Sequence, residues 1–238
     1  VDQKGDVIKK LLPRRGRILD NSSTPNLLAL NIGAWNICAD PSVTVSNRCV
    51  RFVAGELARI LKLNDSELAE RLNQPAVQYI PVARQVPDDL ARQITAHKPK
   101  LPGVYALESS LRQYPQGAQA SHVVGFVNMD GLGSGGVEQQ MNRFLKGSLG
   151  LVEGKRDGRG VEIYPRRRIN ILPTEGADVI LTLDQNIQYM VETALDQAME
   201  QHRARSAWAI VERVRTGEIL AMASRPCFHP SQFRTATQ

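Results

Sequence analysis

The sequence predicts an α+β fold: an irregular, elongated module of short helices and strands, followed by an incomplete α/β segment. Helix-type and strand-type spacings of apolar residues alternate along the 238 residues, and no internal repeat is visible. Five prolines between residues 75 and 102 restrict the strands of that section to short or edge strands. An aromatic share of 5%, with 18 glycines and 13 prolines, indicates a fold rich in loops.

The first half of the chain carries three helix signals. Apolar residues at three-and-four spacing predict an amphipathic helix over 47–61. Asn64 begins the next helix, because Glu67 three residues later completes a capping box. A third helix is expected after Asp88, and residues 103–113 are expected to be extended.

The middle section predicts two further helices and a basic ribbon. We expect a short helix over 118–126 and another over 137–146, which Gly147 can end in a left-handed conformation. Residues 149–171 are typical of a hairpin that turns at Asp157-Gly158, with three consecutive arginines at 166–168.

The final third changes character, which places a domain boundary near residues 172–176. Residues 177–183 predict a buried strand, and Asp184 is the expected N-cap of a long helix. Two strands over 206–214 and 218–224 follow, joined by a tight turn at 215–217. We therefore divide the chain into domains 1–172 and 173–238.

A formal net charge of +6 favours acidic partners. Basic residues gather at 9–17 and again at 155–168, which is compatible with a solvated face or with a membrane-adjacent site. Few aromatic residues lie among them, so a nucleic-acid platform, which needs stacking surfaces as well as charge, is not expected.

The cysteines and histidines do not point to a metal or a cofactor. The sequence has no C-x-x-C and no histidine at ligand spacing. A disulfide between Cys38 and Cys49 is permitted in an oxidising compartment; the alternative is that the three cysteines, including Cys227, are small buried residues. Ser121 beside His122 does not make a triad, and His122 is expected to be a packed or capping residue.

No stretch reaches the roughly 20 apolar residues that span a bilayer, since the best candidate, 27–39, is interrupted by Asn31 and Asn36. The first residues do not have the pattern of a signal peptide. These observations leave open a cytoplasmic protein or a chain trimmed of its anchor.

A glycine loop offers an alternative function. Gly131, Gly133 and Gly136 spell G-x-G-x-x-G before a predicted helix, with Asp157 about 20 residues further on. This pattern would imply an independent nucleotide-binding enzyme. Against it, Asp157 falls in the predicted hairpin turn, and no further βαβ unit follows.

Five segments, in order, resemble class B penicillin-binding proteins. Residues 14–20 are similar to the RG-x-I-x-D motif of that family, 111–127 to R-x-YP-x-G-x-x-A-x-H-x-x-G, and 131–147 to G-x-x-G-x-E followed by a helix. Residues 178–188 and 216–230 look like the linker strand, first helix and first hairpin of the transpeptidase domain. Together they cover most of the chain.

The sequence departs from that pattern in two ways. Residues 21–25 stand where the family has an Arg-Asn-Gly-type turn. In addition, the Ser-x-x-Lys, Ser-x-Asn and Lys-Thr-Gly motifs of the catalytic site are missing, and Arg215-Thr216-Gly217 is interpreted as a hairpin turn. Without the serine and its lysine we expect no acyl-enzyme on this chain.

The resemblance implies a non-catalytic pedestal, or dimerisation, domain over 1–172 and the N-terminal part of a transpeptidase domain over 173–238. The parent would be a serine D,D-transpeptidase of peptidoglycan synthesis, in cell division or cell shape, anchored on the extracytoplasmic (periplasmic) side of the bacterial cytoplasmic membrane. Its implied partners are a membrane-embedded glycan polymerase and other cell-wall synthesis proteins, with peptidoglycan and β-lactams bound by the catalytic domain. No cofactor, metal or nucleic acid is implied.

The motif residues are candidates for structural or partner-binding roles. We predict that the charged ones form one buried network that ties distant segments together; the alternative is that they line a partner-binding surface. The candidates are Arg15, Gly16, Asp20, Arg112, Tyr114, Pro115, Gly117, His122, Gly125, Gly136 and Glu138.

Overall fold

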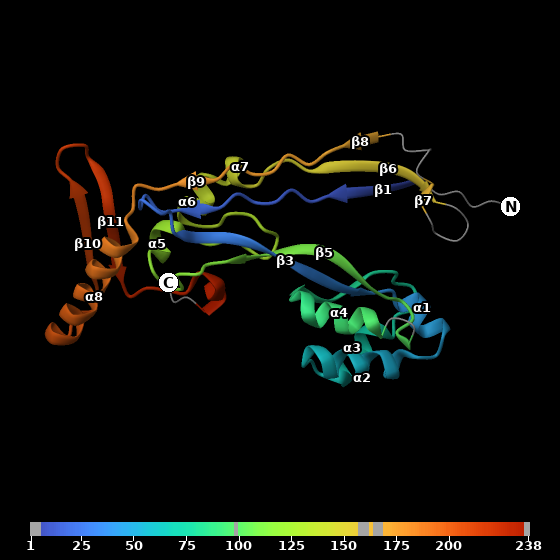
Figure 1. The fold of residues 1–238 in the computed structure, drawn as a ribbon. Helices are drawn as coiled ribbons and strands as arrows, with labels where there is room; N and C mark the ends of the chain where they lie inside the picture. The colour runs from blue at the N-terminus through green and yellow to red at the C-terminus, as the bar shows by residue number, and fades with distance from the viewer. Residues whose placement is uncertain (1–5, 98–99, 157–161, 164–168, 236–238) are drawn as a thin grey trace. The chain divides into compact units, whose positions relative to one another are not determined.

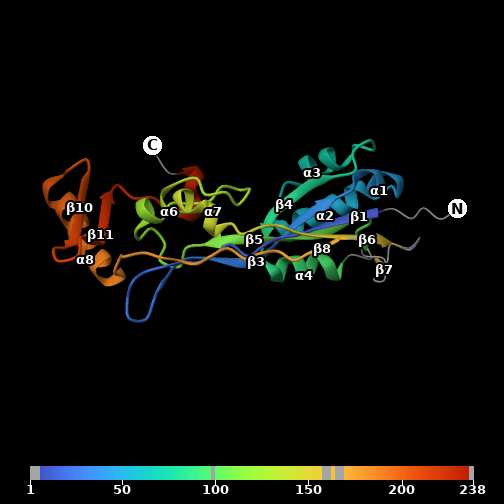
Figure 2. The same cartoon turned by 90° about the horizontal axis from the view of Figure 1, so that it is seen from above.

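A computed structural model describes residues 6–97, 100–156, 162–163 and 169–235 (Figures 1 and 2). The chain forms two compact units, one made of residues 1–31 and 112–238, the other of residues 32–111. We call them the main unit and the insert unit. The α+β class is confirmed, because helices and short strands alternate in both. The predicted boundary at 172 falls within the main unit and stays a prediction.

In its described residues, the insert unit is built from four helices, strand β4, and the two strands that enter and leave it. Strand β3 (Leu27–Ala39) runs into it and β5 (Val104–Gln113) runs out. Between them lie α1 (Pro41–Ser46), α2 (Val50–Leu61), α3 (Asp65–Leu72), β4 (Ile80–Val86) and α4 (Asp88–Ala96). Strand β4 pairs antiparallel with β3.

The helix signals of the insert unit are confirmed. Helix α2 buries Val53 and Leu57 on the apolar face that the spacing predicted, and α3 buries Leu68 and Leu72 against the same core. The Asn64 side chain accepts a hydrogen bond from the backbone N–H of Glu67 at 3.1 Å, as an N-cap does. Helix α4 begins at Asp88.

An antiparallel sheet forms one part of the main unit. It joins β1 (Asp6–Leu11), β6 (Gly150–Arg156), β7 (Glu162–Ile163) and β8 (Ile169–Ile171), with β6 pairing with each of the others. The pairing of β6 with β7 fits the predicted hairpin. Its turn at Asp157-Gly158 and the arginines 166–168 lie outside the described residues.

The hydrophobic core of the main unit surrounds β2 (Ile18–Leu19). This strand pairs antiparallel with β3 and parallel with β9 (Val179–Ile180). The buried core beside them includes Ile18, Leu145 and Leu183. Residues 177–183 were expected to form a buried strand, which is wrong: only two of them form β9, and Ile180 is 64% exposed. Its pairing with the two-residue β2 covers too little of the strand to bury both faces.

Three short helices follow β5. Residues 118–126 contain only the single turn α5 (Ser121–Val124), because Ala120 before it and Gly125 after it both have positive φ. The helix predicted over 137–146 is split at Met141 into α6 (Gly136–Gln140) and α7 (Asn142–Leu145). Gly147 has φ of 63°, as expected for the residue that ends this region.

The C-terminal elements match their sequence signals. Asp184 accepts hydrogen bonds from the N–H groups of Asn186 and Ile187 and caps α8 (Gln185–His202). Strands β10 (Ala207–Arg213) and β11 (Glu218–Arg225) form an antiparallel hairpin, and Gly217 in its turn has φ of 75°. A short 3₁₀ segment, η3 (Pro230–Thr235), follows.

The structure bears on the sequence expectations about the cysteines, metal sites and membrane spans. All three cysteines are free, so the Cys38–Cys49 disulfide does not form; Cys38 is buried, but Cys227 is exposed, so the buried-residue interpretation fails for Cys227. Within the described ranges, no group of three or more His, Cys, Asp or Glu residues is placed to hold a metal. Among the helices of those same ranges, none has the length and apolar character to cross a bilayer.

Candidate functional site

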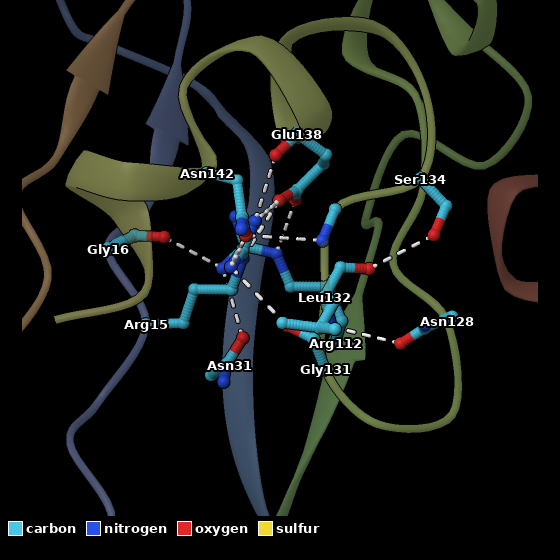
Figure 3. Close-up of polar contacts among 11 residues, drawn as sticks. Arg15, Gly16, Asn31, Arg112, Asn128, Gly131, Leu132, Ser134, Glu138 and Asn142 are labelled. Carbon is cyan, nitrogen blue, oxygen red and sulfur yellow. Dashed lines mark hydrogen bonds and ion pairs between the residues drawn. The ribbon is translucent and has the colours of Figure 1, made fainter. Parts of the chain in front are cut away.

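Three charged residues from distant parts of the chain meet in the main unit (Figure 3). Arg15 comes from the segment before β2, Arg112 from the end of β5, and Glu138 from α6. Glu138 is 0% exposed, and each arginine is 5% exposed. The structure therefore brings together three of the four charged residues that we predicted to form a network.

One carboxylate serves both guanidinium groups. Glu138 Oε2 accepts from Arg15 Nε at 2.9 Å and from Arg15 Nη2 at 2.6 Å, while Oε1 accepts from Arg112 Nε at 2.7 Å. Charge-assisted bonds of this length are among the stronger hydrogen bonds in proteins. We call this group the Arg-Glu network.

Neutral acceptors surround the Arg-Glu network, although Arg112 Nη2 has no hydrogen-bond partner among the described residues. Arg15 Nη1 donates to Asn142 Oδ1 at 2.8 Å, and Arg112 Nη1 donates to Asn31 Oδ1 at 3.0 Å and to the Gly16 carbonyl at 2.8 Å. Sequence reasoning missed both asparagines. The signal for Asn31 was its place as a polar residue inside the apolar run 27–39.

The electrostatics of the Arg-Glu network suit a structural role. Burial lowers the pKa of Arg112, and the charge of Glu138 acts against that shift. An arginine keeps its proton under all physiological conditions, so Arg112 remains a cation despite its burial. Burial likewise raises the pKa of Tyr114, which is therefore a neutral phenol near pH 7. Because all three network residues are buried, their side chains are not available to line a surface that a partner could contact.

The prediction that Asp20 belongs to this network is wrong. Asp20 is 0% exposed, but its carboxylate accepts hydrogen bonds from the N–H of Asn26 at 2.6 Å, from Asn26 Nδ2 at 3.0 Å and from the N–H of Gln185 at 3.2 Å, as well as from Ser22. Residues 21–25, which depart from the family pattern, thus form a turn around Asp20. The bond to Gln185 joins that turn to the first residue of α8.

Asp20 should make the stability of the main unit sensitive to acid. Burial alone would raise the pKa of this carboxyl, but the hydrogen bonds from Ser22, Asn26 and Gln185 outweigh it and hold the pKa below its ordinary value. The unfolded chain therefore takes up this proton at a higher pH than the folded chain. The contribution is fully present above the ordinary aspartate pKa of about 3.9 and is lost as the pH falls through the lower folded value.

We accordingly expect the urea midpoint to fall as the pH drops below about 4, and to fall less steeply in Asp20→Asn. Asp89→Asn, which changes an exposed aspartate of α4, should keep the wild-type pH profile. Parallel profiles for Asp20→Asn and the wild type would contradict the assignment.

The glycines of the motifs allow close approaches of the backbone. A Cβ on Gly16 would lie 1.9 Å from the carbonyl oxygen of Ala177, and one on Gly125 would lie 1.9 Å from that of Gly135. Gly136 has φ of 51°, and its Cβ would lie 2.3 Å from the Val123 carbonyl oxygen. These positions exclude any side chain, which is the physical reason for glycine there.

The remaining motif residues lie in one loop of the main unit, 114–125. Tyr114 is buried, and its carbonyl accepts from the N–H of Gly117, so that Pro115 sits inside a tight turn. His122 is exposed, and its Nε2 lies 3.0 Å from the carbonyl oxygen of Pro226. His122 is therefore a packed surface residue, one of the two roles expected for it.

The glycine loop does not have the setting of a nucleotide site. A Cβ on Gly133 would lie 1.9 Å from the carbonyl oxygen of Glu138, and Gly131 accepts from Arg15 Nη1 at 3.4 Å, so the loop folds back onto the Arg-Glu network. The helix after it, α6, has five residues. Within the described ranges, the two-residue strands β2 and β9 pair in parallel, which is far shorter than the parallel sheet of a dinucleotide-binding fold. Asp157 lies outside those ranges.

Comparison with known proteins identifies the family. Residues 10–181 match the penicillin-binding protein dimerisation domain. The chain belongs to this family. The resemblance to class B penicillin-binding proteins is therefore confirmed, and the chain corresponds to their dimerisation, or pedestal, part. The nucleotide-binding alternative finds no support.

Two relatives of this dimerisation-domain chain illustrate the match. The peptidoglycan D,D-transpeptidase FtsI of Escherichia coli is 33% identical over 97% of the chain, and stage V sporulation protein D of Bacillus subtilis is 32% identical over 94%. The chain spans 39% and 34% of their respective lengths. It thus corresponds to less than half of each relative.

Solved structures share the fold of this family member. A peptidoglycan synthetase from Bifidobacterium adolescentis is 26% identical with a TM-score of 0.62, over 94% of this chain and 45% of that one. Penicillin-binding protein PBP2 from Helicobacter pylori, solved in complex with MreC, is 22% identical with a TM-score of 0.74, over 96% of this chain and 44% of that one. The second likeness concerns the fold alone.

Proposed function

We propose that this pedestal serves a longer protein that acts as a serine D,D-transpeptidase. In that protein a serine attacks the carbonyl between the two D-alanines of a stem peptide, the terminal D-alanine leaves, and the acyl group passes to an amine of a neighbouring strand. Relatives such as FtsI of Escherichia coli carry this activity in their names. The 238 residues contain no Ser-x-x-Lys, so the nucleophile would lie outside them.

The observation that supports a non-catalytic role most directly is the Arg-Glu network. It joins residues 15, 112 and 138 through a fully buried carboxylate and offers no nucleophile or exposed base. Such a network fixes the positions of three segments relative to one another. A frame of this kind suits a module that holds a second domain in a set orientation.

We further propose that the longer protein is anchored in the cytoplasmic membrane, with this chain on its extracytoplasmic side, and that it works with a glycan polymerase and other cell-wall synthesis proteins. Support comes from the Helicobacter pylori protein of the same fold, which was solved in complex with MreC. Calorimetric titration of the full-length protein with the MreC homologue of its own organism tests whether it binds a cell-wall synthesis protein of this kind. Absence of binding at tens of micromolar would contradict it.

Labelling with a fluorescent, membrane-impermeant penicillin tests the function and the side of the membrane together. The 238-residue chain should take up no covalent label, whereas spheroplasts that express the full-length protein should label, and a variant with alanine in place of the serine of its Ser-x-x-Lys should not. Label on the 238-residue chain would contradict the non-catalytic role. A full-length protein that labels only after lysis would contradict the extracytoplasmic location.

A further inference from the structure

Two sets of contacts attach the end of β11 and the segment after it to residues 117–126 of the main unit. Figure 1 shows this red segment passing from β11 back beside α5. One set is charged and consists of the buried residues Ala120, Gln188, Glu192 and Arg225 together with the exposed Asp196; we call it the Glu192 joint. The other lies at the surface: His122, Phe126, Pro226 and Phe228, which we call the His122 latch.

The Glu192 joint connects three elements through one carboxylate. Glu192 Oε1 accepts from the N–H of Ala120 at 2.8 Å and from Gln188 Nε2 at 2.7 Å, and Oε2 accepts from Arg225 Nη2 at 3.2 Å. Glu192 is 8% exposed and Arg225 is 9% exposed. Asp196 holds the other side of Arg225, with Oδ1 2.5 Å from Nε.

The side chain of Gln188 strengthens the same joint. It accepts from the N–H of Met222 at 2.8 Å and donates to the carbonyl of Met222 at 3.0 Å, so it binds the edge of β11 as a neighbouring strand would. Ala120 has φ of 52°, a conformation that residues with a Cβ adopt only where the surroundings impose it. The joint is therefore expected to open only with the unit as a whole.

Within the described residues, the contacts of the His122 latch are one hydrogen bond and two ring contacts, whereas the Glu192 joint has several buried hydrogen bonds. Pro226 O can only accept, so His122 Nε2 donates to it, at 3.0 Å. The rings of His122 and Phe126 each meet Phe228 edge-on, at centroid distances of 5.2 and 6.0 Å. His122 is exposed, and the other three members, Phe126, Pro226 and Phe228, are uncharged residues. Segments held by a few surface contacts open at a much lower free energy than a buried core.

We propose that residues 226–229, which precede the buried Pro230, form a strap that opens at the His122 latch while the Glu192 joint stays closed. His122 is then a positioning residue: its ring determines how much of the time the segment after β11 lies against 117–126. The inference rests on contacts within this chain and is independent of the transpeptidase chemistry. In a longer protein, all polypeptide beyond β11 would be connected through this strap.

Chymotrypsin provides the test, because it cleaves after Phe228 only when the strap is open. For the folded 238-residue chain we expect cleavage after Phe228 at a rate that hardly changes in low urea, the behaviour of local opening. Cleavage after Trp208 should instead rise steeply with urea, since it requires unfolding of the hairpin. If cleavage after Phe228 follows the same urea dependence as cleavage after Trp208, the strap does not open on its own.

The variant His122→Ala isolates the latch. Loss of its hydrogen bond should raise the rate of cleavage after Phe228 roughly three- to tenfold and leave the rate after Trp208 unchanged. His202→Ala, at an exposed site near the end of α8, is the matched control and should change neither rate. An unchanged rate after Phe228 in His122→Ala, or an equal rise at both sites, would overturn the proposal. These results are separate from penicillin labelling, so either proposal can fail alone.

Discussion

Replacing Glu138 by alanine should lower the free energy of unfolding by about 3–5 kcal/mol, the usual loss when one partner of a buried ion pair is removed. Arg15 and Arg112 would keep their charges in a site that excludes water, with only neutral acceptors left around them. The measurement is urea unfolding followed by circular dichroism. The midpoint should fall while the slope with urea stays constant, because the surface exposed on unfolding does not change.

Two controls separate charge from shape in this experiment. Glu138→Gln keeps the volume and one acceptor oxygen, so its effect should lie between those of the wild type and Glu138→Ala. Glu175→Ala changes an exposed glutamate and should stay within about 0.5 kcal/mol of the wild type. If Glu138→Ala also stays within that range, the Arg-Glu network does not stabilise the main unit.

Gly125→Ala should cost about 4 kcal/mol or more, the second large effect. Gly125 has φ of 76° and ψ of −155°, a region that essentially only glycine occupies, and the added Cβ would lie 1.9 Å from the Gly135 carbonyl oxygen. The backbone at Gly125, after α5, would have to move away from the backbone at Gly135, before α6. Losses of this size come from few mechanisms, and enforced overlap of backbone atoms is one of them.

Gly131→Ala is the matched control for this steric argument. Gly131 has the same φ of 76°, but a Cβ there would have open space around it. Only the conformational cost should appear, about 1–2 kcal/mol. Thermal unfolding of the two variants measures the difference. Equal losses would show that the contact between Gly125 and Gly135 is not the origin of the effect.

Local features of this fold could be predicted from the sequence because the signal and the structure occupy the same few residues. The N-caps at Asn64 and Asp184 and the turn at Gly217 each depend on neighbours within three or four positions. The split at Met141 could not be predicted in this way. Nothing in residues 137–146 breaks a helix, and on its far side Asn142 bonds to Arg15, 127 residues away.

The partners of buried charges depend on tertiary structure, which explains why the site was only partly foreseen. The charges and the order of the motifs predicted a buried network of Arg15, Arg112 and Glu138. The same reasoning wrongly included Asp20 in that network. Asp20 has local donors in Ser22 and Asn26 that satisfy its carboxylate before any arginine is needed. Glu192 was missed altogether, since two of its partners, Ala120 and Arg225, lie 72 residues upstream and 33 residues downstream.

The Arg-Glu network also sets an order of events during synthesis. Arg15 and Glu138 are 123 positions apart in the sequence. At translation rates of about 5–20 residues per second, the ribosome therefore adds Glu138 roughly 6–25 s after Arg15. Residues 32–111 are complete before then and contain their own core. All residues of the insert unit are therefore synthesised before Glu138, and until then the Arg15 side chain is solvated and has no counter-ion from Glu138.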